Sequence, residues 1–201
     1  RSMQSLEDGP SRTATLASTW LEIPFREGIP KELWDQAFCR PLRDFLNKPG
    51  KSFRARLVES TWQLVGVQGE LPGELPLIIE WIHAGSLIVD DIQDGSTHRR
   101  GVPTLHQRFG MPIALNAGNS LYFLPLVLLE RLQVPTEVEL ELHRRVCKTM
   151  LQCHRGQALD LAARIENAPQ SQITDLVTAI SELKTASLME LATVLAPTTA
   201  A

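Results

Sequence analysis

Three aspartates, Asp90, Asp91 and Asp94, lie close together at the end of one strongly apolar segment. Residues three or four apart on a helix are neighbours, so Asp94 would lie beside the other two. Two carboxylates about 6 Å apart repel by roughly 3 kcal/mol at an effective dielectric constant near 20, and the negative end of the helix dipole adds to this cost. A hard divalent cation such as Mg²⁺ removes it, because carboxylate oxygens are its preferred protein ligands. The alternative is an acidic run that only ends a helix.

Two arginines and a glycine, Arg99-Arg100-Gly101, begin five residues after Asp94. The guanidinium groups could form surface ion pairs with the aspartates. A bound diphosphate explains more of the pattern, since its oxygens bridge metal ions and also accept paired hydrogen bonds from arginine. An EF-hand calcium loop is excluded, because Ile92 and Gly101 occupy positions that need oxygen ligands.

A second cationic group lies upstream. Lys51 and Arg54, three apart, open a helix after Pro49-Gly50, where free backbone N–H groups add positive potential. A solvated basic turn is the alternative. His83 stands two helical turns before Asp90 and nearly in line with it. It is either a core histidine or a further hydrogen-bond donor to a phosphate.

The elements that must position these residues are helical almost throughout. Apolar spacing and breaker residues predict helices over about 30–46, 51–65, 76–94, 111–132, 136–165 and from 171 onward, ending near Pro197, with a polar loop over 95–103. The segment over 76–94 is apolar around most of its girth, so it should be central and buried. No segment has the alternation of a strand. We expect an all-α bundle over 13–201 preceded by a flexible tail over 1–12.

Composition narrows the class of protein. The chain has 201 residues, 43% hydrophobic and 21% charged, with a formal net charge of -3. Bulk charge therefore recruits neither nucleic acid nor an anionic membrane. The longest strongly apolar run, Leu121 to Leu129, is short of the ~20 residues of a membrane-spanning helix. Three cysteines without metal-ligand spacing predict free thiols. We expect a cytoplasmic protein.

Taken in order, four segments resemble the trans- (E-type) isoprenyl diphosphate synthases, the polyprenyl synthetases that include farnesyl and geranylgeranyl diphosphate synthases. The segments are Gly50-Lys51-Ser-Phe-Arg54, the run from His83 to His106, Gly156-Gln157-Ala-Leu-Asp160, and Lys184-Thr185. The aspartate block followed by Arg-Arg-Gly is the most specific of them. The resemblance covers most of the chain and implies an isoprenoid-synthase-type bundle around a central cavity.

The resemblance also implies a role for each residue. Two or three Mg²⁺ ions would be held by Asp90 and Asp94, with Asp91 in support and Asp160 as a further ligand. The allylic diphosphate would contact Arg99, Lys184 and Thr185, with Gln157 on the cavity wall. Isopentenyl diphosphate would contact four residues: Lys51, Arg54, His83 and Arg100.

The implied reaction is the ionisation of an allylic diphosphate, attack by the double bond of isopentenyl diphosphate, and loss of a proton, which lengthens the chain by five carbons. Electrostatic stabilisation of the leaving group in a dry cavity would drive it. Gly85 and Ser86 would leave the pocket under the growing chain open, favouring C20 or longer products, and Trp81 and Ile82 would form its floor.

Two features depart from the family pattern. Ala55-Arg56 replaces a common arginine-proline pair, and no second aspartate-rich block follows Lys184-Thr185 in this chain. The second departure suggests a truncated synthase, and it keeps open a non-catalytic or regulatory subunit of a heteromeric synthase. A class I terpene cyclase is a further alternative, although it would leave Lys51, Arg54, His83 and Arg100 without a role. The family resemblance also implies a homodimer formed through two long helices.

Overall fold

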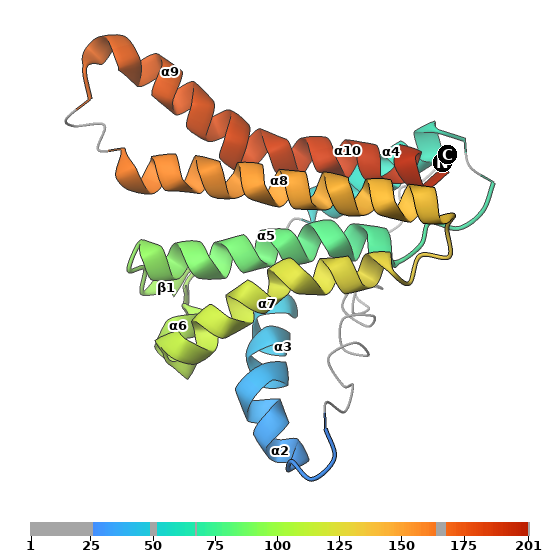
Figure 1. The fold of residues 1–201 in the computed structure, drawn as a ribbon. Coiled ribbons are helices and arrows are strands. Elements are labelled where there is room, and N and C mark those ends of the chain that lie inside the picture. Colours follow the sequence, from blue (N-terminus) through green and yellow to red (C-terminus); the bar gives the residue numbers. More distant parts are fainter. Residues whose placement is uncertain (1–25, 49–51, 67, 164–167, 201) are drawn as a thin grey trace, which may run out of the picture.

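The structure is a computed structural model that describes residues 26–48, 52–66, 68–163 and 168–200. It confirms the predicted all-α class (Figure 1). The predicted tail over 1–12 lies outside the described residues. In chain order the helices are α2 (Lys31–Trp34), a π-helical turn η1 (Asp35–Cys39), α3 (Arg40–Leu46), α4 (Phe53–Leu64), α5 (Glu74–Gln93), α6 (Leu105–Phe109), α7 (Met111–Leu129), α8 (Thr136–Ala162), α9 (Gln170–Ile180), a second π-helical turn η3 (Ser181–Ala186) and α10 (Ser187–Ala200).

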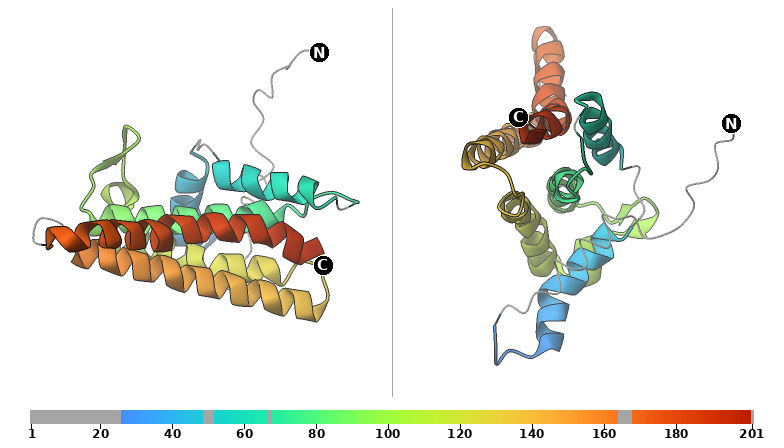
Figure 2. Two further views of the ribbon diagram at one scale, coloured as in Figure 1. Left: turned by 90° about the horizontal axis from the view of Figure 1, so that it is seen from above. Right: turned by 90° about the vertical axis from the view of Figure 1, so that its right-hand side faces the viewer.

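Helix α5 is the centre of the bundle. Viewed end-on, it is surrounded by α4, α7, α8 and α10 (Figure 2). Its apolar residues are buried on several sides, including Leu77, Ile78 and Ile88. Each such side chain contributes roughly 1.5–3 kcal/mol when fully removed from water. The segment predicted to be central and buried is therefore the one that carries Asp90 and Asp91.

Glycines allow α5 and α7 to pack closely. A Cβ atom on Gly85 would lie 2.8 Å from the carbonyl oxygen of Gly118.

By length and composition α7 is also a candidate membrane span, with 39% of its apolar window buried. The core helix of a soluble protein passes the same test, so this is weak evidence for a span. The predicted lack of a span stays a prediction.

The segment predicted as a polar loop contains a small hairpin, which corrects the expectation of no strands. Strands β1 (His98–Arg99) and β2 (Val102–Pro103) pair antiparallel. The turn between them has positive φ at both residues, 51° at Arg100 and 80° at Gly101, as a two-residue hairpin turn requires. Buried Thr104 closes its base by donating a hydrogen bond to the Ser96 carbonyl at 2.9 Å.

The last part of the described chain, α9 through α10, runs along α8 (Figure 1). This helix runs out within 197–201 as predicted, since α10 continues to Ala200 with Pro197 inside it. A proline inside a helix removes one backbone hydrogen bond. Leu191 and Leu195 on the same helix are buried, and their packing keeps α10 against its neighbours.

Candidate active site

Asp90 lies on the last turn of α5 with a side chain only 17% exposed. Burial raises the pKa of its carboxyl above the ordinary range, although the nearby Lys184 ammonium opposes this and Asp94 reinforces it. Asp94 is the exposed residue that follows the helix, and its backbone N–H donates to the Asp90 carbonyl at 2.8 Å. The two carboxylates predicted to share a face are thus one helical turn apart.

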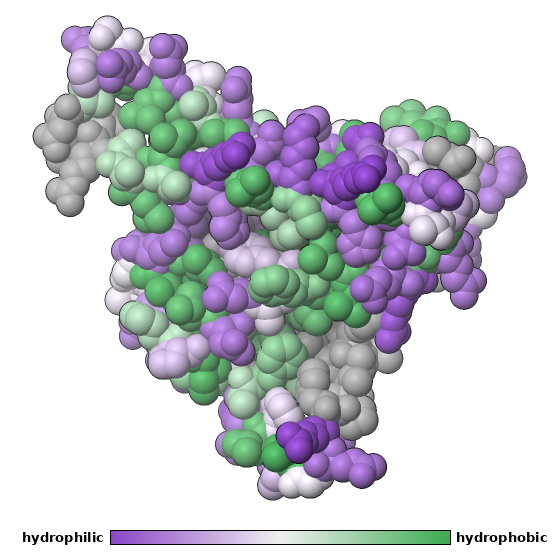
Figure 3. Space-filling view, viewed as in Figure 1, coloured by the Kyte–Doolittle hydropathy of each residue, from purple (hydrophilic) through white to green (hydrophobic). Residues whose placement is uncertain are grey.

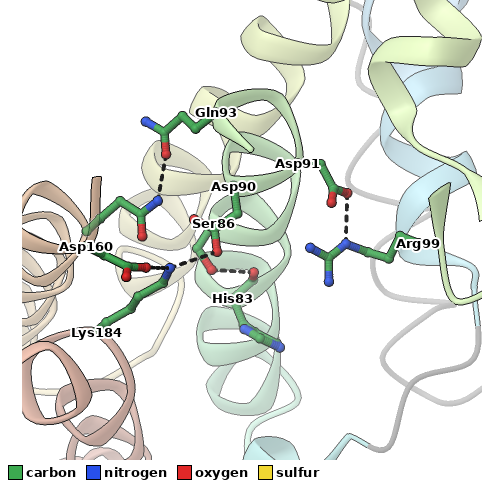
Figure 4. Close-up of polar contacts among 9 residues, drawn as sticks. His83, Ser86, Asp90, Asp91, Gln93, Arg99, Asp160 and Lys184 are labelled. Carbon is green, nitrogen blue, oxygen red and sulfur yellow. Dashed lines mark hydrogen bonds and ion pairs between the residues drawn. The ribbon is translucent and has the colours of Figure 1, made fainter. Parts of the chain in front are cut away.

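Lys184 reaches this carboxylate from the opposite side of the cavity. Its Nζ lies 2.8 Å from Oδ2 of Asp160 on α8 and 3.4 Å from Oδ2 of Asp90 (Figure 4). Burial lowers the pKa of Lys184, but the hydrogen bond to Asp160 and the charges of both carboxylates outweigh this, so that its pKa is raised overall. The ammonium therefore bridges two helices, and we call this contact the Asp90–Lys184–Asp160 bridge.

A glycine explains how Lys184 comes so close to α8. Lys184 belongs to the π-helical turn η3, a local widening that often occurs at functional sites. A Cβ atom on Gly156 of α8 would lie 2.6 Å from the backbone nitrogen of Lys184 and 2.8 Å from the Cβ of Leu183. Only a residue without a side chain fits there.

Asp91 points elsewhere. It lies about 100° around α5 from Asp90, is 2% exposed, and accepts a hydrogen bond from Nε of Arg99 at 2.8 Å. Asp91 and Arg99, both predicted as site residues, are thus in direct contact. Asp91 holds the arginine of the hairpin and does not share the face of Asp90 (Figure 4). A support role for Asp91 is compatible with this placement.

The second predicted anion site lies where α4 meets α5, with His83 two turns before Asp90. Arg54 on α4 has a buried Nε with no hydrogen-bond partner among the described residues. Glu80 accepts a hydrogen bond from the Ala55 N–H at 3.1 Å and so ties the start of α4 to α5. Burial, followed by the charges of Arg54, Arg100 and Arg99, lowers the pKa of His83 to about 4. His83 is therefore neutral at pH 7. Lys51, predicted to complete this group, lies outside the described residues.

These groups meet around one cavity of about 380 Å³, within the size range of small-molecule sites. Its lining combines charged and polar side chains with apolar ones. The predicted residues in its lining are Arg54, Ile82, His83, Ser86, Asp90, Gln157, Lys184 and Thr185. Gln157 also donates a hydrogen bond to Gln93 at 2.8 Å, which links α8 to α5.

Two of the predicted chain-length residues do not line this cavity. Gly85 is about 140° around the helix from Asp90, and Trp81 about 180°, so each points away from it. Gly85 packs on Gly118 of α7, and Trp81 is 1% exposed in the core. Ser86, about 40° from Asp90, lies in the lining as expected. Counting residues back from Asp90 was insufficient because the direction around the helix decides which residue faces the cavity.

Further lining residues were missed, among them Tyr122, Met150, Cys153 and His154. The Tyr122 ring meets the His154 ring edge-on at 5.0 Å between centroids. Met150, Cys153 and Gln157 follow one another at intervals of three and four residues. They therefore share one face of α8. Extending the face of Gln157 back along the helix would have found them.

The donor set also bears on a metal ion. Among the described residues, no three acidic, histidine or cysteine side chains are grouped closely enough to hold one. Asp90 and Asp94 offer carboxylate oxygens from consecutive turns. Magnesium is usually bound by one or two carboxylates together with substrate phosphates and water. The residues therefore fit Mg²⁺ that is held jointly with a diphosphate.

A family model described as polyprenyl synthetase matches residues 35–201. The chain belongs to the polyprenyl synthetase family. A geranylgeranyl pyrophosphate synthase of Eremothecium gossypii is 33% identical over 129 residues, which are 63% of this chain and 40% of that protein. A copalyl diphosphate synthase of Talaromyces verruculosus is 34% identical over 63% of this chain and 13% of its own length.

Solved structures confirm the isoprenoid-synthase fold. An FPP/GFPP synthase from Zymomonas mobilis is 28% identical and matches with a TM-score of 0.77, over 94% of this chain and 68% of that one. The chain thus spans 40% of the Eremothecium relative and about two thirds of this structure. The activity, substrates and partners of the whole protein are for this reason matters of proposal.

Proposed function

We propose that this protein is a magnesium-dependent prenyltransferase that joins an allylic diphosphate to isopentenyl diphosphate, giving a trans-prenyl diphosphate of C20 or longer. The observation that supports it most is the polarity of the cavity. Asp90, Lys184 and Gln157 line it together with apolar side chains, among them Ile82, Met150 and Leu188. A diphosphate with a hydrocarbon tail combines the same two kinds of surface.

The allylic diphosphate would lie at the aspartate end. Asp90 and Asp94, with Asp160, would hold Mg²⁺, which when bound stabilises charge on the departing diphosphate. Lys184 would donate hydrogen bonds to the same diphosphate, with Arg99 held ready by its contact with Asp91. The apolar wall excludes water, so that the allylic cation meets the double bond of isopentenyl diphosphate and not a water molecule.

Isopentenyl diphosphate would occupy the second cationic group. The buried Nε–H of Arg54 has no hydrogen-bond partner among the described residues and can donate to an anion. Neutral His83 can donate an N–H to the same anion without adding charge. A class I cyclase has one diphosphate and no use for this group. It remains the second candidate, since one relative, from Matsumurasca onukii, bears the name terpene synthase.

The decisive experiment supplies labelled isopentenyl diphosphate and an allylic diphosphate with Mg²⁺ and follows label in the extracted prenyl product. Asp90→Asn should lower kcat by at least a hundredfold. Arg54→Gln should raise KM for isopentenyl diphosphate while KM for the allylic substrate changes little. Consumption of the allylic diphosphate without incorporation of label would favour the cyclase, and no turnover of either substrate would favour a non-catalytic subunit.

We also propose a homodimer formed through α7 and α8. Both helices expose large apolar side chains: Met111, Leu115, Phe123 and Val127 on α7, and Leu140 and Leu151 on α8. The four on α7 recur at multiples of four residues and therefore form one stripe. The face shown in Figure 3 contains apolar patches over these two helices. A stripe of this kind exposed to water is a typical association surface.

A further inference from the structure

The Asp90–Lys184–Asp160 bridge occupies the place where the metal ion would bind. Asp90 comes from α5 and Asp160 from α8, and the only described cation within 4 Å of both carboxylates is the Nζ of Lys184, at 3.4 and 2.8 Å. Without it, the acidic groups of two helices would face one another unbalanced. The Lys184 ammonium thus places between the two carboxylates the positive charge that a divalent cation would supply there.

The position of this lysine is built into the fold. The π-helical turn carries it, and the contact of that turn with Gly156 sets its distance from α8. Yet its side chain is 30% exposed, and a four-carbon stem can move its ammonium by rotamer changes. The backbone therefore fixes where the bridge forms, and a change of the Lys184 rotamer can break it.

We propose that Lys184 acts as an internal counter-cation that competes with free Mg²⁺ and is transferred to the diphosphate when a metal–diphosphate complex binds. The inference rests on the proposed function, which makes Asp90 a metal ligand. Its consequence is a difference in affinity: the site binds Mg²⁺ together with a diphosphate much more tightly than it binds Mg²⁺ alone.

Charge explains why the transfer is favourable. Free Mg²⁺ must displace an ammonium that is already paired with two carboxylates, and the displaced ammonium would then face the metal. A diphosphate brings several negative oxygens, so that the ammonium gains charge-assisted hydrogen bonds as the carboxylates turn to the metal.

The test measures metal binding directly and needs no turnover. Mn²⁺ serves as the probe for the Mg²⁺ site: after equilibrium dialysis, bound Mn²⁺ is the excess on the protein side over the protein-free side, counted after acid release from its electron paramagnetic resonance signal. Titrations at pH 8 are made with and without inorganic pyrophosphate on the wild-type protein, Lys184→Gln, Lys184→Arg and Lys31→Gln. Lys31 is an exposed lysine at the start of α2, so its substitution is a matched loss of one charge.

Lys184→Gln should bind Mn²⁺ alone about tenfold more tightly than the wild type and pyrophosphate with Mn²⁺ about tenfold more weakly. Lys184→Arg, which keeps the charge, should stay near the wild type, as should Lys31→Gln. Urea denaturation checks that all four proteins are folded. Equal Mn²⁺ affinity in Lys184→Gln and the wild type overturns this inference alone, provided that pyrophosphate still binds. Failure of every protein to bind Mn²⁺ with pyrophosphate overturns the proposed function with it.

Discussion

Gly156→Ala tests whether the contact between α8 and η3 sets the position of Lys184. In an ordinary helix this substitution stabilises by roughly 0.5–1 kcal/mol, because alanine loses less backbone entropy on folding. Here the added Cβ would lie 2.6 Å from the Lys184 nitrogen, and relief to ordinary contact at 3.4 Å requires a shift of about 0.8 Å. The atoms in the way are backbone or near it, so the turn itself must move.

The magnitude follows from that shift. Overpacking of a tight contact costs typically 1–3 kcal/mol, so we expect a net destabilisation of about 1–2 kcal/mol. A displacement near 1 Å of a group in an active site can lower the rate by about a hundredfold. We expect kcat for the proposed reaction to fall about tenfold to a hundredfold, through the Asp90–Lys184–Asp160 bridge.

The assay is a double-mutant cycle with Lys184→Ala, measuring both kcat and urea stability. If Gly156 acts through Lys184, its substitution should lower kcat much less in the Lys184→Ala background, while its effect on stability stays similar in both. Gly118→Ala is the control, since its Cβ would meet the side chains of Val89 and Ile88 at 3.0 and 3.1 Å but not η3. The reasoning is refuted if Gly156→Ala is as stable and active as the wild type, or if its loss of kcat is the same in both backgrounds.

Three other perturbations have clear expected outcomes. Ser86→Phe should shorten the product seen by chromatography, because Ser86 lines the cavity; an unchanged product length would contradict this. The pKa of His83 is lowered from 6.5 to about 4, so the unfolded chain binds the proton first, and stability present above pH 6.5 should fall by up to about 3 kcal/mol as pH drops to 4. Urea titrations should show His83→Gln losing less stability over that window, and an identical loss would exclude His83 as the cause. Phe123→Asp should shift sedimentation from dimer to monomer, whereas a wild-type dimer that persists would place the interface elsewhere.

The sequence was most informative where one physical requirement dominates. Apolar residues on most sides of the segment before Asp90 predicted a buried central helix. Helix α5 ends within a residue of the predicted boundary. Arg54, His83 and Lys184 were proposed as cavity residues from three separate segments, and the structure places all three in one lining. A long helix with a clear spacing of apolar residues can pack against its neighbours in few orientations.

Short-range geometry was harder to predict. The strands at Arg99 and Val102 are two residues long, too short for alternation to show in a sequence. The hairpin depends on positive φ at Arg100 as well as Gly101, and only the glycine is a visible signal. Likewise, the close approach of Gly156 to η3 involves a partner 28 residues away in the chain, which no local pattern reveals.

The charges of the site show what completes it. Three of its carboxylates already have cationic partners: Asp91 pairs with Arg99, and Asp90 and Asp160 share Lys184. On the cationic side, Arg54 keeps a buried Nε that has no hydrogen-bond partner in the part of the chain that the structure describes. A free cation would meet carboxylates that are already paired, whereas an anion would satisfy a donor that is not. We therefore expect the site to take up an anion more readily than a free cation, and a metal ion to enter it together with a diphosphate.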